Sequence, residues 1–321
     1  MAISKSQQFF ESLWYRKTIW WLWLFWPFHL LLRIIVWLRR FFYRIGLFKS
    51  TKLKTPVIVI GNITVGGTGK TPLAIYLLEL LKSQGYKPGL ISRGYGGKSE
   101  HYPLTVTEST PASESGDEPF LIRRRTQVPV VVDPIRARGA QQLEAQGCNI
   151  IICDDGLQHY ALQRDIEIVV IDANRKLGNG WLMPFGPLRE PKSRLKQADH
   201  IIVNGKDMLL EPEPIQAIND HDIEFREPFT AVAAIGNPER FYNTLEGLGY
   251  QFERQSFPDH YQFSKQDFES FQTNIVMTEK DAVKCLSFAD ERFYFLPVSA
   301  KLSKQFLESL MEQIKAITHE S

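Results

Sequence analysis

The chain has 321 residues, of which 44% are hydrophobic and 23% are charged, which excludes a disordered protein and leaves room for two hydrophobic cores. Three cysteines are too few for a disulfide framework or a four-cysteine zinc site, so we expect a reducing compartment. The formal net charge of +2 lacks the basic excess of proteins held to nucleic acid by its phosphates, and we predict no nucleic-acid partner.

Residues 1–50 differ from the rest of the chain. They carry eight Lys and Arg residues against one Glu, a net charge of +7, and six of the seven tryptophans. The run 19–38 is apolar apart from His29 and Arg33, so it is long enough to cross a hydrocarbon core of ~30 Å. Arg33 inside the run, Pro27 near its middle and aromatic residues along its whole length favour a helix that lies in the membrane interface.

Such an interfacial helix buries its Trp, Phe and Leu side chains among acyl chains. The basic residues that then meet lipid phosphates are Arg16, Lys17, Arg33, Arg39, Arg40 and Arg44. A spanning helix, a helix docked on the protein's own core and a cleaved signal peptide are the alternatives, and the last lacks a small-x-small cleavage site. For an interfacial or a spanning helix, the basic flank after the helix predicts that the remaining chain lies on the cytoplasmic side.

From residue 55 onward, short β-branched runs alternate with helical stretches, which is typical of a parallel sheet with crossover helices. We predict strands at 57–60, 89–92, 128–132, 149–153, 166–171 and 200–203, with helices at 73–82 and 137–146. The Pro-containing stretches 211–214 and 227–228 predict a boundary between a core domain over 51–225 and a smaller α/β domain over 226–321. In the smaller domain we predict strands at 231–235, 275–277 and 293–298 and helices at 238–245 and 304–317. The predicted fold class is therefore α/β.

The sequence GNITVGGTGKTP at residues 61–72 follows the first predicted strand directly and precedes a helix. Its glycines let backbone N–H groups converge on phosphate oxygens, and the helix N-terminus adds its positive dipole end. In such a P-loop Lys70 reaches the β- and γ-phosphates and the Thr71 hydroxyl ligates Mg²⁺. Thr64 replaces the first glycine of the usual pattern, which is a mild departure. The predicted nucleoside-triphosphate site comprises Thr64, Val65, Gly66, Gly67, Thr68, Gly69, Lys70 and Thr71.

Two carboxylates end the fourth predicted strand, at the sheet edge where open α/β sheets bind ligands. They are Asp154 and Asp155, and they are the predicted metal ligands beside the P-loop. Asp172, at the end of the next strand, is a competing candidate. We prefer the first pair because Gln158 and His159 follow at once, which makes Gln158 a candidate nucleotide contact. His159 has the alternative role of a loop histidine bonded to the backbone.

Further clusters could recognise the acceptor of a phosphoryl group. Arg93 ends a strand, where a guanidinium can clamp phosphate oxygens. Asp117 and Glu118 stand in a predicted turn, where one carboxylate can accept a proton from an attacking hydroxyl. Arg189 is presented by a loop rich in Pro and Gly. His260, in the smaller domain, can act as the imidazole partner of a carboxylate. Each of these clusters, taken alone, is more often a solvated turn than a catalytic element.

Taken in order, these motifs resemble one family, the tetraacyldisaccharide 4′-kinases, or lipid A 4′-kinases. The motifs are GNITVGGTGKTP at 61–72, SRGY at 92–95, GDEP at 116–119, DDG-x-QH at 154–159, PLRE at 187–190 and TEKDAVK at 278–284. The resemblance runs from about residue 12 to residue 300 and includes the basic, Trp-rich N-terminus.

The resemblance implies an enzyme of lipid A biosynthesis in a Gram-negative bacterium, at the cytoplasmic face of the inner membrane. With ATP and Mg²⁺, it transfers the γ-phosphoryl group to the 4′-hydroxyl of an acylated glucosamine disaccharide 1-phosphate, giving lipid IVA. The roles implied by motif are charge stabilisation by Lys70, proton removal by Asp117 assisted by His260, phosphate positioning by Arg93 and Arg189, and Mg²⁺ binding by Thr71 with Asp154 or Asp155.

The main alternative is a membrane-recruited P-loop switch, a GTPase or ATPase that binds partners instead of phosphorylating a lipid. A GTPase needs [NT]-K-x-D after a strand to recognise the base, and TEKD at 278–281 has Glu279 where the lysine belongs. A kinase for a soluble acceptor, with an incidental hydrophobic helix, is a further alternative that predicts activity without lipid.

Overall fold

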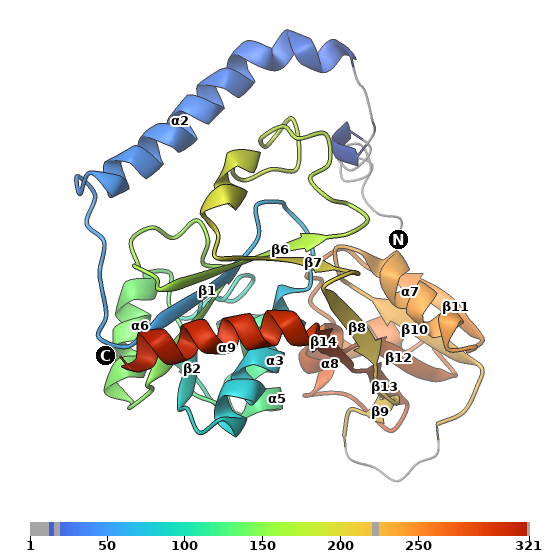
Figure 1. Cartoon of the computed structure of the whole chain (residues 1–321). Helices are drawn as coiled ribbons and strands as arrows, with labels where there is room; N and C mark the ends of the chain where they lie inside the picture. The colour runs from blue at the N-terminus through green and yellow to red at the C-terminus, as the bar shows by residue number, and fades with distance from the viewer. Residues whose placement is uncertain (1–12, 16–19, 220–224, 320–321) are drawn as a thin grey trace.

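The computed structural model describes residues 13–15, 20–219 and 225–319, and Figure 1 shows their arrangement. The predicted lipid-facing residues Arg16 and Lys17 lie outside the described residues. The described chain builds two β-sheets flanked by helices, together with one long helix near the N-terminus.

The first sheet has nine strands among the described residues, in the order β14-β8-β7-β6-β1-β5-β2-β4-β3. Neighbours from β7 through β4 are parallel, whereas β14 and β3 at the two edges run antiparallel to their neighbours. The bounds are β1 Val57–Gly61, β2 Pro88–Ser92, β3 Leu104–Val106, β4 Val130–Val132, β5 Ile150–Asp154, β6 Ile166–Asp172, β7 His200–Asn204, β8 Met208–Pro212 and β14 Val298–Leu302.

The continuous Val and Ile runs of the central strands reflect burial on both faces. In β1, Ile58 and Ile60 join one hydrophobic core while Val57 and Val59 join the other, because successive side chains of a strand point to opposite faces. The helices that supply the first core are α3 Lys70–Ser83, α5 Asp117–Thr126 and α9 Lys304–His319, and α6 Arg136–Ala145 supplies the second. The α/β fold class is confirmed, and the parallel strand ends share one edge.

The second sheet has the order β11-β10-β12-β13-β9 and is parallel except for β9 at its edge. Helix α7 packs on one face and α8 on the other, so this sheet has its own two hydrophobic layers. The bounds are β9 Gln216–Ala217, β10 Phe229–Ala233, α7 Pro238–Gly247, β11 Phe252–Ser256, η3 Lys265–Phe268, β12 Asn274–Thr278, α8 Glu279–Cys285 and β13 Phe293–Leu296.

The predicted single strand at 293–298 is wrong. It is two strands, β13 and β14, that belong to different sheets and are separated by Pro297, which has no N–H to continue a ladder. The second sheet is therefore inserted between β8 and β14, and residues 298–319 return to the first sheet. The predicted smaller domain over 226–321 therefore differs from the second sheet, which begins with β9 and ends with β13. Where the chain leaves the first sheet it contacts the point where it returns, because Glu213 N donates to Pro297 O at 2.9 Å.

Helix α2 Trp26–Arg44 follows the short 3-10 helix η1 Trp20–Phe25. Pro27 stands in the first turn of α2, where its missing N–H breaks no hydrogen bond, and not in the middle of a helix as predicted. Most of the large apolar side chains of α2 are exposed, and His29 is the only buried residue of this helix. The remaining short helices are α4 Ala112–Ser115 and η2 Lys192–Gln197.

Helix α2 stands at the outer edge of the molecule, above the segments that follow β6 (Figure 1). His29 Nε2 accepts a hydrogen bond from Leu182 N at 3.1 Å, and Arg39 Nη2 donates to Gln158 O at 3.1 Å. These hydrogen bonds join polar groups of α2 to the rest of the protein, while most of its large apolar side chains stay exposed. The exposure disfavours the alternative of a helix docked on the protein's own core. Residues Leu22–Arg44 are long and apolar enough to cross a membrane, so this segment is compatible with membrane association.

Candidate active site

The P-loop lies between β1 and α3, and buried side chains fix its shape. Asn62 Nδ2 contacts Thr68 Oγ1 at 3.3 Å and Gly66 O at 3.4 Å from within the loop. Asn204, at the end of β7, donates from Nδ2 to Thr68 O at 2.9 Å. Gly69 has φ +93°, and a Cβ at this position would lie 2.5 Å from Asn204 Nδ2. Only glycine therefore fits where the loop meets the helix.

A second segment runs alongside the P-loop. Val65 N donates to Pro187 O at 2.9 Å, and Arg189 N donates to Ile63 O at 2.7 Å. This short antiparallel contact brings the predicted Pro/Gly loop to the sheet edge and aims Arg189 at Asp155. The Arg189 Nη1 atom is 3.0 Å from Asp155 Oδ1 and 2.9 Å from Oδ2.

A cavity of about 530 Å³ lies over the P-loop and takes its walls from both sheets. Lys70, Thr71, Glu118 and Asp155 line it from the first sheet, and Arg240, His260 and Lys280 line it from the second. The structure thus brings the predicted nucleotide-binding loop to the same cavity as residues from the far end of the chain. Asp154 lies behind the surface of this cavity, as a buried residue at the end of β5.

The two aspartates after β5 have opposite electrostatic environments. Burial alone would raise the pKa of Asp155, but Lys70, whose Nζ is 3.6 Å from Asp155 Oδ1, and Arg189 outweigh it and lower that pKa. Burial and the nearby charge of Glu118 raise the pKa of Asp154 to about 7. Asp154 Oδ1 is buried and has no hydrogen-bond partner among the described residues.

This donor set fits Mg²⁺. An unpartnered carboxylate oxygen of Asp154 and the hydroxyl of Thr71 are the hard oxygen ligands that the ion prefers. Within the described part of the chain, no three His, Cys, Asp or Glu side chains gather into a ready-made metal cage. Mg²⁺ commonly binds through one or two carboxylates together with substrate phosphates and waters, so a complete cage is not required.

Asp117 and His260 are in contact across the two sheets. His260 Nδ1 lies 3.2 Å from Asp117 Oδ2, and the two residues are 143 positions apart in sequence. The side chain of Asp117 is buried, and Lys284 Nζ lies 3.9 Å from the same Oδ2 atom. The segment predicted as a turn at 116–119 is instead the start of α5, where acidic residues favour the positive end of the helix dipole.

The other predicted residues have distinct surroundings. Gln158 Nε2 donates to Asn62 O at 3.0 Å and so supports the start of the P-loop. Arg93 is exposed and has no hydrogen bond or ion pair within the described ranges. Burial, followed by the charges of Arg136 and Arg164, lowers the pKa of His159 to about 4.

The competing candidate Asp172 caps a loop. Its Oδ1 atom accepts from the backbone N–H groups of Asn174 at 2.9 Å and Arg175 at 2.8 Å. It does not line the P-loop cavity. Asp155 lines this cavity, whereas Asp154 is buried behind it, so the preference for Asp154 and Asp155 over Asp172 stays a prediction.

Three residues were missed by the sequence analysis. Lys280 Nζ lies 3.0 Å from Glu118 Oε1, and Arg240 Nη2 donates to Asn204 Oδ1 at 3.2 Å. Asn204 carried a usable signal, because it is polar and ends a parallel strand at the edge that holds the P-loop. Lys280 lies in the TEKDAVK motif, for which no separate role was predicted. Arg240 carried no signal, because only the tertiary fold brings α7 to β7.

The family profile described as tetraacyldisaccharide-1-P 4′-kinase, LpxK, matches residues 21–315. The chain belongs to this family. The predicted resemblance is confirmed, and with it the prediction of a kinase of lipid A biosynthesis.

Among full-length LpxK relatives, the tetraacyldisaccharide 4′-kinase of Tolumonas auensis is 48% identical and the match covers 96% of this chain and 98% of that protein. The tetraacyldisaccharide 4′-kinase of Aeromonas hydrophila is 47% identical, with 95% of this chain and 96% of that protein covered. A crystal structure of LpxK from Aquifex aeolicus, described as an "apo" form in complex with ATP, superposes with a TM-score of 0.77 at 31% identity, covering 92% of this chain and 98% of that one.

Proposed function

We propose that this LpxK family member transfers the γ-phosphoryl group of ATP to the 4′-hydroxyl of tetraacyldisaccharide 1-phosphate and so forms lipid IVA. The observation that carries this proposal is the meeting of the P-loop and His260, with Asp117 in contact behind it, at one cavity between two sheets. A P-loop binds the donor, and a carboxylate with an imidazole partner suits a hydroxyl acceptor.

The P-loop side of the cavity serves the nucleotide. Backbone N–H groups of the loop and the N-terminus of α3 bind the phosphates, and Lys70 stabilises the charge on the transferring group. Thr71 and Asp154 would hold Mg²⁺, which supplies charge neutralisation at the β- and γ-phosphates. Arg189 orients Asp155 at 2.9–3.0 Å, which keeps this carboxylate ionised beside Lys70.

The opposite side of the cavity serves the acceptor. His260 lines the cavity and lies 3.2 Å from the buried Asp117, so the proton of the attacking 4′-hydroxyl passes to the Asp117–His260 pair through the imidazole, which allows a weak base to work at neutral pH. The exposed guanidinium of Arg93 is available for a substrate phosphate, the acceptor type that a planar guanidinium fits best. Phosphoryl transfer depends mainly on positioning and charge stabilisation, and these residues supply both.

The membrane completes the proposal. A tetraacylated substrate stays in the bilayer, so an enzyme held at the same surface avoids extracting it. The exposed apolar surface of α2 and the basic residues around it fit a monotopic association with the cytoplasmic face of the inner membrane.

A GTPase switch is disfavoured by the surroundings of Asp281. In the base-recognition motif this carboxylate must reach a guanine, but here it is fully buried. It accepts from Ala234 N at 2.9 Å and pairs with Lys284 Nζ at 2.7 Å. These contacts tie Asp281 to the protein interior and leave no oxygen for a base in the cavity.

The test is the transfer of labelled γ-phosphate from ATP to tetraacyldisaccharide 1-phosphate in mixed micelles with Mg²⁺. Wild type should form labelled lipid, and Lys70→Ala and Asp117→Ala should each lose about 10²–10⁴ in rate, the range of a general base or a charge-stabilising group. His260→Ala should lower the rate and change its pH dependence, whereas the exposed His101→Ala should do neither.

Three results would contradict the proposal. Nucleotide hydrolysis without lipid product would favour the switch. Equal activity on a soluble acceptor without lipid would favour a soluble-substrate kinase. A His260→Ala variant with unchanged rate and pH profile would make its contact with Asp117 purely structural.

A further inference from the structure

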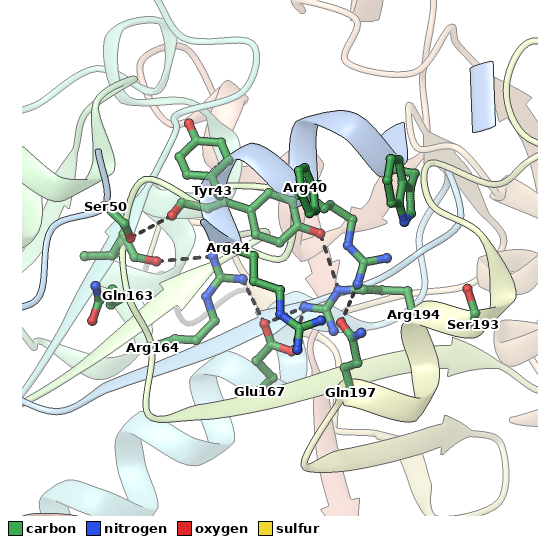
Figure 2. A pocket seen from close by; sticks show the side chains of 14 residues that line it. Arg40, Tyr43, Arg44, Ser50, Gln163, Arg164, Glu167, Ser193, Arg194 and Gln197 are labelled. Carbon is green, nitrogen blue, oxygen red and sulfur yellow. Dashed lines mark hydrogen bonds and ion pairs between the residues drawn. The ribbon is translucent and has the colours of Figure 1, made fainter. Parts of the chain in front are cut away.

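A second cavity, of about 760 Å³, lies beneath the C-terminal half of α2 (Figure 2). Its floor comes from the segments 160–167 and 193–197, and we refer to it as the α2 cavity. It shares no lining residue with the P-loop cavity, and the proposed reaction makes no use of it.

The walls of the α2 cavity carry more positive than negative charge. Its cationic lining residues are Arg40, Arg44, Arg164 and Arg194. The carboxylate in the lining is Glu167, which already binds Arg164 Nη1 at 2.8 Å and Arg194 Nη2 at 2.5 and 2.6 Å. Arg194 is 2% exposed, and its Nη1 atom still finds no partner among the described residues. Glu190, a buried carboxylate outside the lining, lies 3.9 Å from Arg40 Nε and 3.6 Å from Arg194 Nε. Both carboxylates are therefore paired with arginines of the wall, and the four guanidinium groups still outnumber them.

Several hydrogen-bond donors of this wall are unused. The side chains of Arg44, Ser193 and Gln163 make no hydrogen bond or ion pair within the described ranges of the chain. Figure 2 shows Arg40 and Arg44 reaching from the helix toward the floor of the cavity. Arg40 contacts Gln197 Oε1, and its Nε lies 3.9 Å from Glu190 Oε2, so of the two helix arginines that line the cavity Arg44 is the one without a counter-ion among the described residues. An anionic oxygen, such as that of a phosphate, is the partner that these donors fit.

The helix side of the same cavity also carries apolar rings, beside Arg40 and Arg44. Trp37 and Phe41 line it with stacked rings whose centroids are 5.2 Å apart, and their side chains are 58% and 39% exposed. They share one face of α2 with Arg40 and Arg44, because residues three, four and seven positions apart lie on one side of a helix. The cavity thus pairs an apolar wall with a cationic floor, which matches a molecule that is apolar at one end and anionic at the other.

We propose that the α2 cavity binds the phosphate headgroup of an anionic glycerophospholipid from the bilayer surface. The phosphate contacts Arg44, Ser193 and Gln163, and the acyl chains leave along Trp37 and Phe41. This site goes beyond the kinase reaction but rests on the membrane association proposed above. It would fix the orientation of the protein on the membrane by holding one lipid beside the helix.

The test measures how the full-length protein partitions onto vesicles of phosphatidylcholine alone and of phosphatidylcholine mixed with phosphatidylglycerol. Arg44→Gln should weaken binding to the anionic vesicles about 20-fold, because it removes a charge and a hydrogen-bond donor from the cavity. The matched control is Arg33→Gln, which removes the same charge from an exposed position of α2 outside the cavity and should cost about fivefold or less. Neither change should alter binding to the neutral vesicles.

A second variant tests the cavity without a change of charge. Ser193 is exposed, so Ser193→Trp should leave the fold intact, fill the cavity and weaken binding to anionic vesicles. Equal losses for Arg33→Gln and Arg44→Gln, or no loss for Ser193→Trp, would overturn the site and leave only general attraction to the surface. Displacement of the protein by sn-glycerol 3-phosphate would overturn it in favour of a soluble phosphate ester. Failure of the wild type to bind either kind of vesicle would refute the membrane association itself.

Discussion

At the scale of single residues, His159 shows how an arginine-rich setting holds an imidazole neutral. Burial and the charges of Arg136 and Arg164 lower its pKa to about 4, and its Nε2 atom is buried without a hydrogen-bond partner within the described chain. A neutral imidazole adds no further positive charge to a region that already holds several guanidinium groups. His159 therefore stays uncharged at the pH at which the kinase works.

This lowered pKa makes stability depend on pH. In the unfolded chain His159 has a pKa of about 6.5, and in the folded chain a pKa of about 4. Between these two values the unfolded chain binds a proton that the folded chain does not, so the free energy of unfolding decreases as the pH falls from about 6.5 to about 4. Glutamine does not titrate, so the free energy of unfolding of His159→Gln should fall less than that of the wild type over this pH range. We expect the difference to be about 1–2 kcal/mol, because solvent reaches the half-buried ring and screens its charge. Urea unfolding at several pH values measures this, with the exposed His101→Gln as the control. An identical pH dependence in wild type and His159→Gln would contradict it.

At the scale of the element, the P-loop needs glycine at position 69 more than at position 67. Gly69 has φ +93°, and a Cβ added at this position would lie 2.5 Å from Asn204 Nδ2. A Cβ added at Gly67 would have no atom within 4 Å. An alanine at Gly69 must therefore adopt a left-handed conformation and displace the side chain that holds Thr68 O.

We expect Gly69→Ala to weaken ATP binding at least tenfold, since left-handed strain of about 1–2 kcal/mol adds to the loss of the Asn204 contact. Gly67→Ala should change the dissociation constant by less than about threefold, because only a small entropic effect applies. Isothermal titration calorimetry with ATP and Mg²⁺ compares the two. Similar losses for both variants would show that the loop is not held at Gly69 in particular.

At the scale of the whole molecule, Arg125 joins the points where the chain passes between the sheets. From α5 it donates to Glu279 Oε1 at 2.9 Å and to Glu213 Oε1 at 3.2 Å, and it contacts Ser299 Oγ at 3.4 Å. Glu213 precedes the second sheet, Glu279 begins α8 within it, and Ser299 follows Pro297 on the return to the first. One guanidinium thus holds both crossings and the inserted sheet together.

Loss of Arg125 should loosen this junction. Arg125→Gln leaves the mostly buried Glu279 without its counter-ion, and we expect the unfolding free energy to fall by about 1–3 kcal/mol, less than for a fully buried pair. Arg124→Gln, on the exposed side of the same helix, removes the same charge and should change stability by no more than about 0.5 kcal/mol. Chemical denaturation measures the unfolding free energy of both variants. An equal decrease in both would show that the change in net charge, and not the loss of the Arg125 contacts, lowers the stability.

The predictable parts of this structure are those encoded locally. The central strands were predicted within one or two residues because their β-branched runs are buried on both faces, and the P-loop was predicted because a strand, glycines and a helix follow one another directly. Strand β8 and the edge strand β14 that pairs with it were missed, since their residues are only partly buried and Pro297 stands directly before β14. Helix α5 was missed because its sequence, DEPFLIRRRT, is short and strongly charged.

The candidate site was predictable to the extent that its residues lie in motifs. Asp117 and His260 were paired through resemblance to a family, because nothing local links residues 143 positions apart. The contact between Arg240 and Asn204 depends on the packing of α7 against β7, which is a property of the tertiary structure. The assigned roles of the site residues, including Thr71 and Asp154 as metal ligands, stay predictions until the variants are measured.

The return of β14 to the first sheet has a consequence for synthesis. Translation delivers α2 first, then most of the first sheet, then the whole second sheet, and only afterwards the strand that pairs with β8. Val298, at the start of β14, is also part of the wall of the P-loop cavity. A nascent chain can therefore present its apolar helix long before the ribosome releases the residues that close the nucleotide cavity.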